Sequence, residues 1–196
     1  MSPTLRRVML LSFALVLLLV DVITKWATVA FLKARPPVVL LPILDFRYVE
    51  NRDIAFSLME WLPDRIRPTV IVLLAGLMTI YVIFLFVRYA AEYLLLGFGL
   101  SLILSGAIGN LLDRFTRGFV VDFIHVHYGT YSWPVFNVAD ICVSTGIGLI
   151  AIGLFLVPDE NDVPPPNAES GEEAEAAPPK DTDPRETKAP TTPKDN

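Results

Sequence analysis

Two aspartates lie where an apolar segment meets a polar loop: Asp122 in Val120-Val121-Asp122-Phe123, and Asp140 in Phe136-Asn137-Val138-Ala139-Asp140. A carboxylate at the mouth of a membrane helix is energetically costly, so it marks a candidate functional site. Two carboxylates held close together share one proton and can activate a water molecule, which is the chemistry of aspartyl proteolysis. Whether Asp122 and Asp140 lie close together depends on how the rest of the chain folds.

The composition divides the chain into an apolar part and an acidic tail. Residues 1–157 carry twelve Lys and Arg against ten Asp and Glu, whereas residues 158–196 carry four against eleven, together with nine of the sixteen prolines. A segment with this composition cannot bury enough apolar surface to offset the entropy of ordering it. We expect residues 1–157 to form the membrane domain and residues 158–196 to be a disordered, acidic, proline-rich tail.

Four apolar stretches are long enough to cross a bilayer, which takes about 20 residues. The first is too long for a cleaved signal peptide and is interrupted by Asp21 and Lys25, which are four residues apart and can pair on one helix face. The sequence therefore predicts an all-α integral membrane protein, a bundle of four spanning helices over residues 8–32, 66–87, 93–112 and 135–157.

The loop after the first span has structure of its own. Residues 44–48 alternate apolar and polar side chains as a half-buried strand does, and residues 51–53 are typical of a turn. Ser57-Leu58-Met59-Glu60 fits a capping box that opens a short interfacial helix before Pro63. We expect a small external platform of strand and interfacial helix over about residues 36–65.

Small or polar residues recur every four positions in the last two spans and predict packing faces. They are Ser101, Ser105 and Gly109 in the third span, and Asp140, Ser144 and Gly148 in the fourth. On this pattern, Asp140 faces neighbouring helices and not lipid. The segment from Phe115 to Tyr131, which carries Asp122, is expected to be a loop.

With four spans, the end of the first, the loop after it, the end of the third and the start of the fourth share one membrane face. The conspicuous polar residues all occupy those places: Asp21, Lys25, Asn51, Asn110, Asp113, Arg114, Asp122, Asn137 and Asp140. This shared face predicts a single site. The distribution of Lys and Arg between loops does not orient the protein, because the first loop is itself rich in basic residues.

Other readings of these residues stay open. His125-Val126-His127 beside Asp122 could bind zinc, although two surface histidines in a polar loop are the simpler interpretation, and we expect no metal or other cofactor. The Asp21–Lys25 pair could serve a small proton-coupled transporter subunit or a non-catalytic scaffold. Cys142 lies among aliphatic residues and is expected to be a buried small side chain.

Five motifs, in order, resemble those of the lipoprotein signal peptidase (signal peptidase II) family, four-helix aspartyl peptidases of the bacterial inner membrane. Asp21-Val22-Ile23-Thr24-Lys25-Trp26 resembles D-x-x-T-K-W, and residues 51–56 resemble N-x-G-x-A-F. Residues 105–114 resemble G-G-A-x-G-N-x-x-D-R, and the segments around Asp122 and Asp140 resemble V-V-D-F and F-N-x-A-D.

The resemblance implies that Asp122 and Asp140 are the catalytic dyad of an intramembrane aspartyl endopeptidase. It implies that Asn51, Asn110, Arg114 and Asn137 bind substrate or order the site, with Asp113, Asp21 and Lys25 in supporting roles. The implied substrate is a diacylglyceryl-modified prolipoprotein, cut just before its lipidated cysteine. The site would face the periplasm, with both termini in the cytoplasm. We expect contact with membrane lipids, a monomer, and no nucleic-acid partner.

Two residues depart from the family pattern. Asp53 stands where the family has glycine, which adds charge and reduces backbone freedom in that loop. Ser105 replaces the first glycine of the third motif and keeps the position small. Asp53 puts the mobility of its loop and the range of substrates in question.

Overall fold

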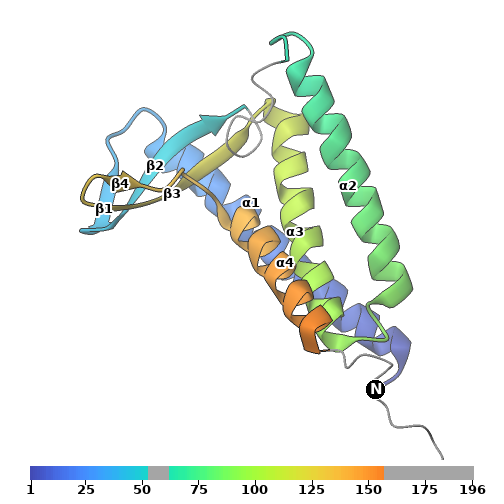
Figure 1. Cartoon of the computed structure of the whole chain (residues 1–196). Coiled ribbons are helices and arrows are strands. Elements are labelled where there is room, and N and C mark those ends of the chain that lie inside the picture. Colours follow the sequence, from blue (N-terminus) through green and yellow to red (C-terminus); the bar gives the residue numbers. More distant parts are fainter. Residues whose placement is uncertain (53–61, 157–196) are drawn as a thin grey trace, which may run out of the picture. The chain divides into compact units, whose positions relative to one another are not determined.

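The computed structural model describes residues 1–52 and 62–156, and within them four long helices accompany a small sheet (Figure 1). The elements are α1 (Pro3–Leu32), β1 (Val38–Leu41), β2 (Leu44–Asn51), α2 (Arg67–Tyr89), α3 (Leu94–Arg117), β3 (Val120–Tyr128), β4 (Tyr131–Ser132) and α4 (Val138–Leu156). All four helices are long and apolar enough to cross a membrane. The predicted four-helix membrane fold with a small β platform is confirmed.

Two helices run further than the sequence predicted. Helix α1 begins at Pro3, capped by Ser2, whose hydroxyl accepts the Leu5 N–H at 3.2 Å. Helix α3 continues to Arg117 and ends at Gly118, whose φ of 80° is the left-handed conformation that glycine adopts readily at a helix end. The predicted interfacial helix at Ser57-Leu58-Met59-Glu60 and the predicted tail lie outside the described residues.

Helix α3 is the centre of the bundle, because it packs against α1, α2 and α4. Half of the residues in its most apolar segment are buried, compared with 22% or less of the residues in the most apolar segment of each of the other three helices. Leu10 of α1 and Phe86 of α2 join Leu100 and Leu104 of α3 in the apolar core. Side chains elsewhere on the helices are large, apolar and exposed, as lipid-facing surfaces require.

The small residues of α3 form the predicted packing face, since Ser101, Ser105 and Gly109 are all buried. The corresponding prediction for α4 is confirmed for Asp140, which accepts a hydrogen bond from Asn110 of α3, and wrong for the other two residues: Ser144 is exposed and Gly148 has open space beside it. The packing face of α4 instead carries Ala139, Cys142 and Gly146, all buried. In lipid both faces of a helix are apolar, so a row of small residues does not by itself identify the packing face.

The segment expected to be a loop between α3 and α4 is largely a strand. β3 pairs antiparallel with β2, with Asp45 opposite His125 and Val49 opposite Asp122. Between these pairs β2 has an extra residue, since Arg47 and Tyr48 together face Phe123, and such a bulge bends the strand. The strands are ordered β1-β2-β3-β4, and the sheet contacts α1 and α3.

Close approach of α3 and α4 depends on Gly106, because a Cβ at that position would lie 2.3 Å from the Ala139 carbonyl oxygen. Gly106→Ala should therefore destabilise the protein by about 1–3 kcal/mol, the usual cost of overpacking. Gly76→Ala in α2 is the matched control, since its Cβ would meet nothing within 4 Å. Thermal unfolding in detergent checks this, and equal stability of the two variants would contradict the packing described.

Candidate active site

Asn137 and Asp140 form a reciprocal cap at the start of α4. The Asn137 Oδ1 accepts the Asp140 N–H at 2.9 Å, and the Asp140 Oδ2 accepts the Asn137 N–H at 3.2 Å. This capping box satisfies two backbone donors and places a carboxylate at the positive end of the helix dipole. The N-x-x-D spacing signals this cap, which was not among the features predicted from the sequence.

Asp122 lies on β3 and reaches the same asparagine. The Asn137 Nδ2 donates to Asp122 Oδ1 at 2.6 Å, while Asn51 Nδ2 donates to Asp122 Oδ2 at 2.8 Å. The backbone holds this arrangement, because the Phe136 carbonyl accepts the N–H groups of Phe123 and Ile124 at 3.0 and 2.8 Å. The structure therefore brings Asp122 and Asp140 to one site, each hydrogen-bonded to Asn137.

Lys25 is the buried cation of the site, with 1% of its surface exposed. Its Nζ lies 2.9 Å from Asp21 Oδ2 and 3.2 Å from Asp113 Oδ2, and donates to Asn110 Oδ1 at 2.9 Å. An ammonium has three N–H donors and no acceptor. Here one of them is hydrogen-bonded to Asn110, while the carboxylates of Asp21 and Asp113 oppose the charge as ion pairs. Lys25 thus joins α1 to α3.

The two acids paired with Lys25 also hold backbone of the elements that carry the candidate carboxylates. Asp21 Oδ1 accepts the Ala139 N–H of α4 at 2.8 Å, and Asp113 Oδ2 accepts the Val121 N–H of β3 at 3.1 Å. Asp113 also pairs with Arg117 one turn later. The position of each candidate carboxylate is thereby tied to the Lys25 cluster.

The orientation of the asparagine amides follows from these donors. Lys25 only donates, so the Asn110 oxygen must face it, and the Asn110 Nδ2 then donates to Asp140 Oδ1 at 2.9 Å. The Asp140 N–H likewise fixes the Asn137 oxygen, which leaves the Asn137 Nδ2 facing Asp122. Both amides present N–H donors to the carboxylates, and such donors favour the ionised form of a carboxyl group.

The remaining predicted site residues lie at the edge of this network. Arg114 follows Asn110 by one turn of α3, and its Nη1 donates to the Asn110 carbonyl at 3.2 Å. Arg114 and Asn51 both line a small cavity of about 40 Å³ bordered by Ile71 of α2 and Phe119. Ser105 is buried and its hydroxyl donates to the Leu102 carbonyl at 2.8 Å, whereas Asp53 lies outside the described residues.

Burial and charge shift the acidity of Asp122. Burial of the side chain, together with the negative charge of Asp140, raises the pKa of Asp122 to about 6, against the hydrogen bonds from Asn51 and Asn137 that lower it. An aspartate ordinarily has a pKa of about 3.9. Asp122 is therefore able to exchange a proton near neutral pH, as general acid–base catalysis requires.

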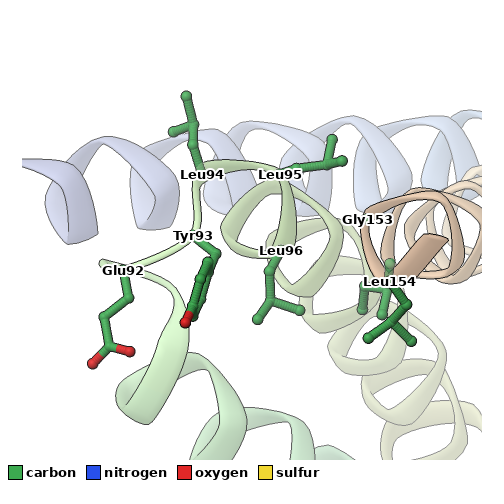
Figure 2. A pocket seen from close by; sticks show the side chains of 8 residues that line it. Glu92, Tyr93, Leu94, Leu95, Leu96, Gly153 and Leu154 are labelled. Atoms are coloured by element: carbon green, nitrogen blue, oxygen red, sulfur yellow. The ribbon is translucent and has the colours of Figure 1, made fainter. Parts of the chain in front are cut away.

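A larger cavity, of about 540 Å³, is lined by none of these groups; Figure 2 shows its lining side chains. It is lined by Glu92, Tyr93, Leu94, Leu95, Leu96, Ile150, Gly153 and Leu154. These residues belong to the turn before α3, the start of α3 and the end of α4, so the cavity is at the opposite end of both helices from Asn110 and Asp140. Its lining is mostly apolar, and Glu92 has no second carboxylate beside it among the lining residues, so the cavity does not provide an aspartyl pair.

The histidines differ from the expectation of two surface residues in a loop. Both lie on β3; His125 is buried, and its Nδ1 and Nε2 contact Asp45 Oδ2 at 2.9 Å and Ser132 Oγ at 2.7 Å. His125 is buried because β3 pairs with β2. The sequence did not predict this burial, since it did not predict strand β3. Cys142 is a buried free thiol, as expected.

Replacement of Lys25 by methionine should destabilise the protein by about 3–5 kcal/mol, because Asp21 and Asp113 would stay buried without their counter-charge. Lys33→Met is the matched control, since Lys33 is exposed and its Nζ lies 5.6 Å from the centre of the Tyr48 ring. Denaturant unfolding in detergent measures both. A similar, small effect of the two substitutions would contradict the central role of Lys25.

The pKa of Asp122 also predicts a pH-dependent stability difference. With a pKa of about 6 when folded and 3.8 when unfolded, Asp122 binds its proton more tightly in the folded state, so its stabilising effect is lost as pH rises from about 4 to about 6. The free energy of unfolding of Asp122→Asn should rise by up to about 3 kcal/mol relative to that of the wild type over that pH range. Unfolding of both proteins at several pH values checks this; a constant difference would contradict it.

The chain is similar to known lipoprotein signal peptidases. The family model described as Signal peptidase (SPase) II matches residues 13–156. The chain is 37% identical over 145 residues to a lipoprotein signal peptidase of Aquifex aeolicus, covering 74% of this chain and 84% of that protein. It is 34% identical over 151 residues to the lipoprotein signal peptidase of Acinetobacter baylyi, covering 75% and 82%.

The fold is also similar to a solved structure described as a bacterial membrane enzyme. The TM-score is 0.69 at 25% identity, over 81% of this chain and 92% of that one. A second structure with the same description gives a TM-score of 0.66 at 26% identity, over 78% and 94%. With the family model spanning all but the first turns of the helical domain, the chain belongs to the signal peptidase II family.

Proposed function

We propose that Asp122 and Asp140 are the catalytic pair with which this lipoprotein signal peptidase cuts its substrate. The observation that carries the proposal is the convergence of both carboxylates on Asn137, through its Nδ2 at 2.6 Å from Asp122 and its N–H at 3.2 Å from Asp140. Two aspartates hydrogen-bonded to one asparagine, with the pKa of Asp122 raised to about 6, support the assignment of an aspartyl dyad.

In the proposed mechanism the pair holds one proton and positions a water molecule. The ionised carboxylate takes a proton from that water as its oxygen attacks the scissile carbonyl carbon, and the protonated carboxyl donates to the carbonyl oxygen. In the collapse of the tetrahedral gem-diol the protonated carboxyl donates its proton to the leaving amine and the C–N bond breaks. The ionised carboxylate takes the proton of one hydroxyl of the intermediate, and that oxygen becomes the carbonyl of the new carboxyl group. The pair is left with one proton, ready for the next cycle.

The neighbouring residues have positioning roles in this proposal. Asn110 and Asn137 keep their N–H groups toward the carboxylates, and Asn51 restrains Asp122 from the side of β2. Asp21, Lys25 and Asp113 fix the backbone on either side. Arg114, beside Asn51 at the small cavity, is suited to hold a substrate carbonyl.

The chain is a multi-pass membrane protein that processes prolipoproteins. We propose further that the substrate carries diacylglycerol on its cysteine, that its acyl chains lie against the exposed apolar helix faces, and that cleavage occurs just before that cysteine. The enzyme would act as a monomer in the bacterial inner membrane, with the site toward the periplasm and both termini in the cytoplasm.

The arrangement of charge does not favour the transporter alternative. Among the described residues, the buried charged side chains are Asp21, Lys25, Asp45, Asp113 and Asp122. They lie at one end of the helices or on the sheet, whereas a proton path would need such groups along the whole thickness of the bilayer. The clustering supports a single hydrolytic site.

The proposal is tested by incubating the purified full-length protein with a diacylglyceryl-modified prolipoprotein and identifying the products by mass spectrometry. Asp122→Asn and Asp140→Asn should each reduce processing at least about 100-fold, because each removes a proton-transfer group. Asp64→Asn is the matched control, since its side chain is 94% exposed. Unfolding curves establish that the variants fold. Normal processing by either site variant would contradict the proposal, and cleavage of the unmodified precursor would contradict the lipid requirement.

A further inference from the structure

A second cluster of ionisable side chains lies on the sheet and has no part in the proposed hydrolysis. It consists of Asp45 on β2 with His125 and His127 on β3. The candidate ligand atoms of the three side chains all lie within 4.8 Å of one another. The cluster is well enclosed, because Asp45 and His125 are buried and His127 is partly buried.

The strand pairing explains why these residues meet. Asp45 lies directly opposite His125 in the β2–β3 ladder, and His127 follows two residues later, so its side chain leaves the same face of β3. The two imidazole rings are stacked, with their centres 5.0 Å apart. A His-x-His pair on one strand with a third ligand on the adjacent strand presents three ligands from a rigid frame.

More potential hydrogen-bond donors surround Asp45 Oδ2 than this oxygen can accept from. Asp45 Oδ2 has three nitrogens around it: Arg47 Nη2 at 2.8 Å, His125 Nδ1 at 2.9 Å and His127 Nε2 at 3.2 Å. A carboxylate oxygen has about two lone-pair sites, so three hydrogen bonds exceed its capacity. A cation accepting lone pairs from the two imidazoles and the carboxylate would satisfy all three ligands.

Outer contacts also orient the ligands in the way metal sites require. The His125 Nε2 is 2.7 Å from Ser132 Oγ, which fixes the ring with Nδ1 toward Asp45. The Arg47 Nε donates to Asp45 Oδ1 at 2.8 Å and so holds the carboxylate plane. Hydrogen bonds of this kind, to the second ring nitrogen or second carboxylate oxygen, set the orientation of metal ligands.

We propose that Asp45, His125 and His127 bind one divalent transition-metal ion of the zinc class. Two imidazole nitrogens and a carboxylate oxygen suit such ions, which bind them at about 2.0–2.2 Å and complete a tetrahedron with water. The ion would cross-link β2 to β3 at His125, which is three residues after Asp122 on β3. It would thereby stabilise the strand that carries Asp122. It would take no part in peptide hydrolysis.

The experiment uses the full-length protein, purified without a polyhistidine tag and treated with a chelator, with Zn²⁺ and Co²⁺ as probes. We expect one tightly bound Zn²⁺ by calorimetry, visible absorption of bound Co²⁺, and a higher unfolding temperature with Zn²⁺. Asp45→Asn and His127→Gln should weaken binding at least about tenfold and remove the Co²⁺ absorption. Glu50→Gln, on the same strand as Asp45, should bind as the wild type does.

Asp122→Asn separates this site from the catalytic pair and should retain the bound ion. The proposal is overturned if the wild type binds no stoichiometric metal. It is also overturned if Asp45→Asn and His127→Gln bind as the wild type does, or if Asp122→Asn alone abolishes binding. His127 is 32% exposed on its side chain, so His127→Gln is suited to preserve folding, and its unfolding curve without metal checks this.

Discussion

The buried ammonium of Lys25 is the interaction on which the site depends. A charge enclosed among membrane helices is costly unless ionic and hydrogen-bonding partners surround it. Here Asp21, Asp113 and Asn110 supply three oxygens, and Arg117 balances the second acid. The cluster of two acids and two bases is neutral overall. Its geometry fixes where α1, α3, β3 and the first turn of α4 meet.

From this cluster the chemistry of the site follows by hydrogen-bond direction. Because Lys25 can only donate, it turns the Asn110 amide so that its N–H faces Asp140. The helix N-terminus turns Asn137 in the same manner toward Asp122. Carboxylates inside a membrane protein need hydrogen-bond donors of fixed orientation. Both amides are fixed, because the Lys25 ammonium and the Asp140 N–H can only donate and so must face the amide oxygens. The two amides therefore stabilise negative charge on the carboxylates within the helix bundle.

The sequence predicted the parts of this structure that depend on local pattern. Runs of apolar residues identified the four spans, and helix parity placed residues as distant as Asp21 and Asp140 on one face. Strand β3 was not predicted because its partner, β2, is some seventy residues earlier in the chain. Pairing between distant segments cannot be inferred from the local residue pattern. The burial of His125 was not predicted for the same reason. The packing face of α4 was misassigned at Ser144 because lipid and protein neighbours favour similar side chains.

If Asp122 and Asp140 are the catalytic pair, the charge of one carboxylate must affect the proton affinity of the other. Infrared difference spectroscopy can titrate the protonated carboxyl group in the wild type, Asp122→Asn and Asp140→Asn. The wild type should show a carboxyl group that titrates with a midpoint of about 6 and is missing from Asp122→Asn. In Asp140→Asn the midpoint should fall, because the negative charge that raises the pKa of Asp122 is gone. A midpoint that is unchanged in Asp140→Asn would show that the two carboxylates do not interact, and would contradict the account.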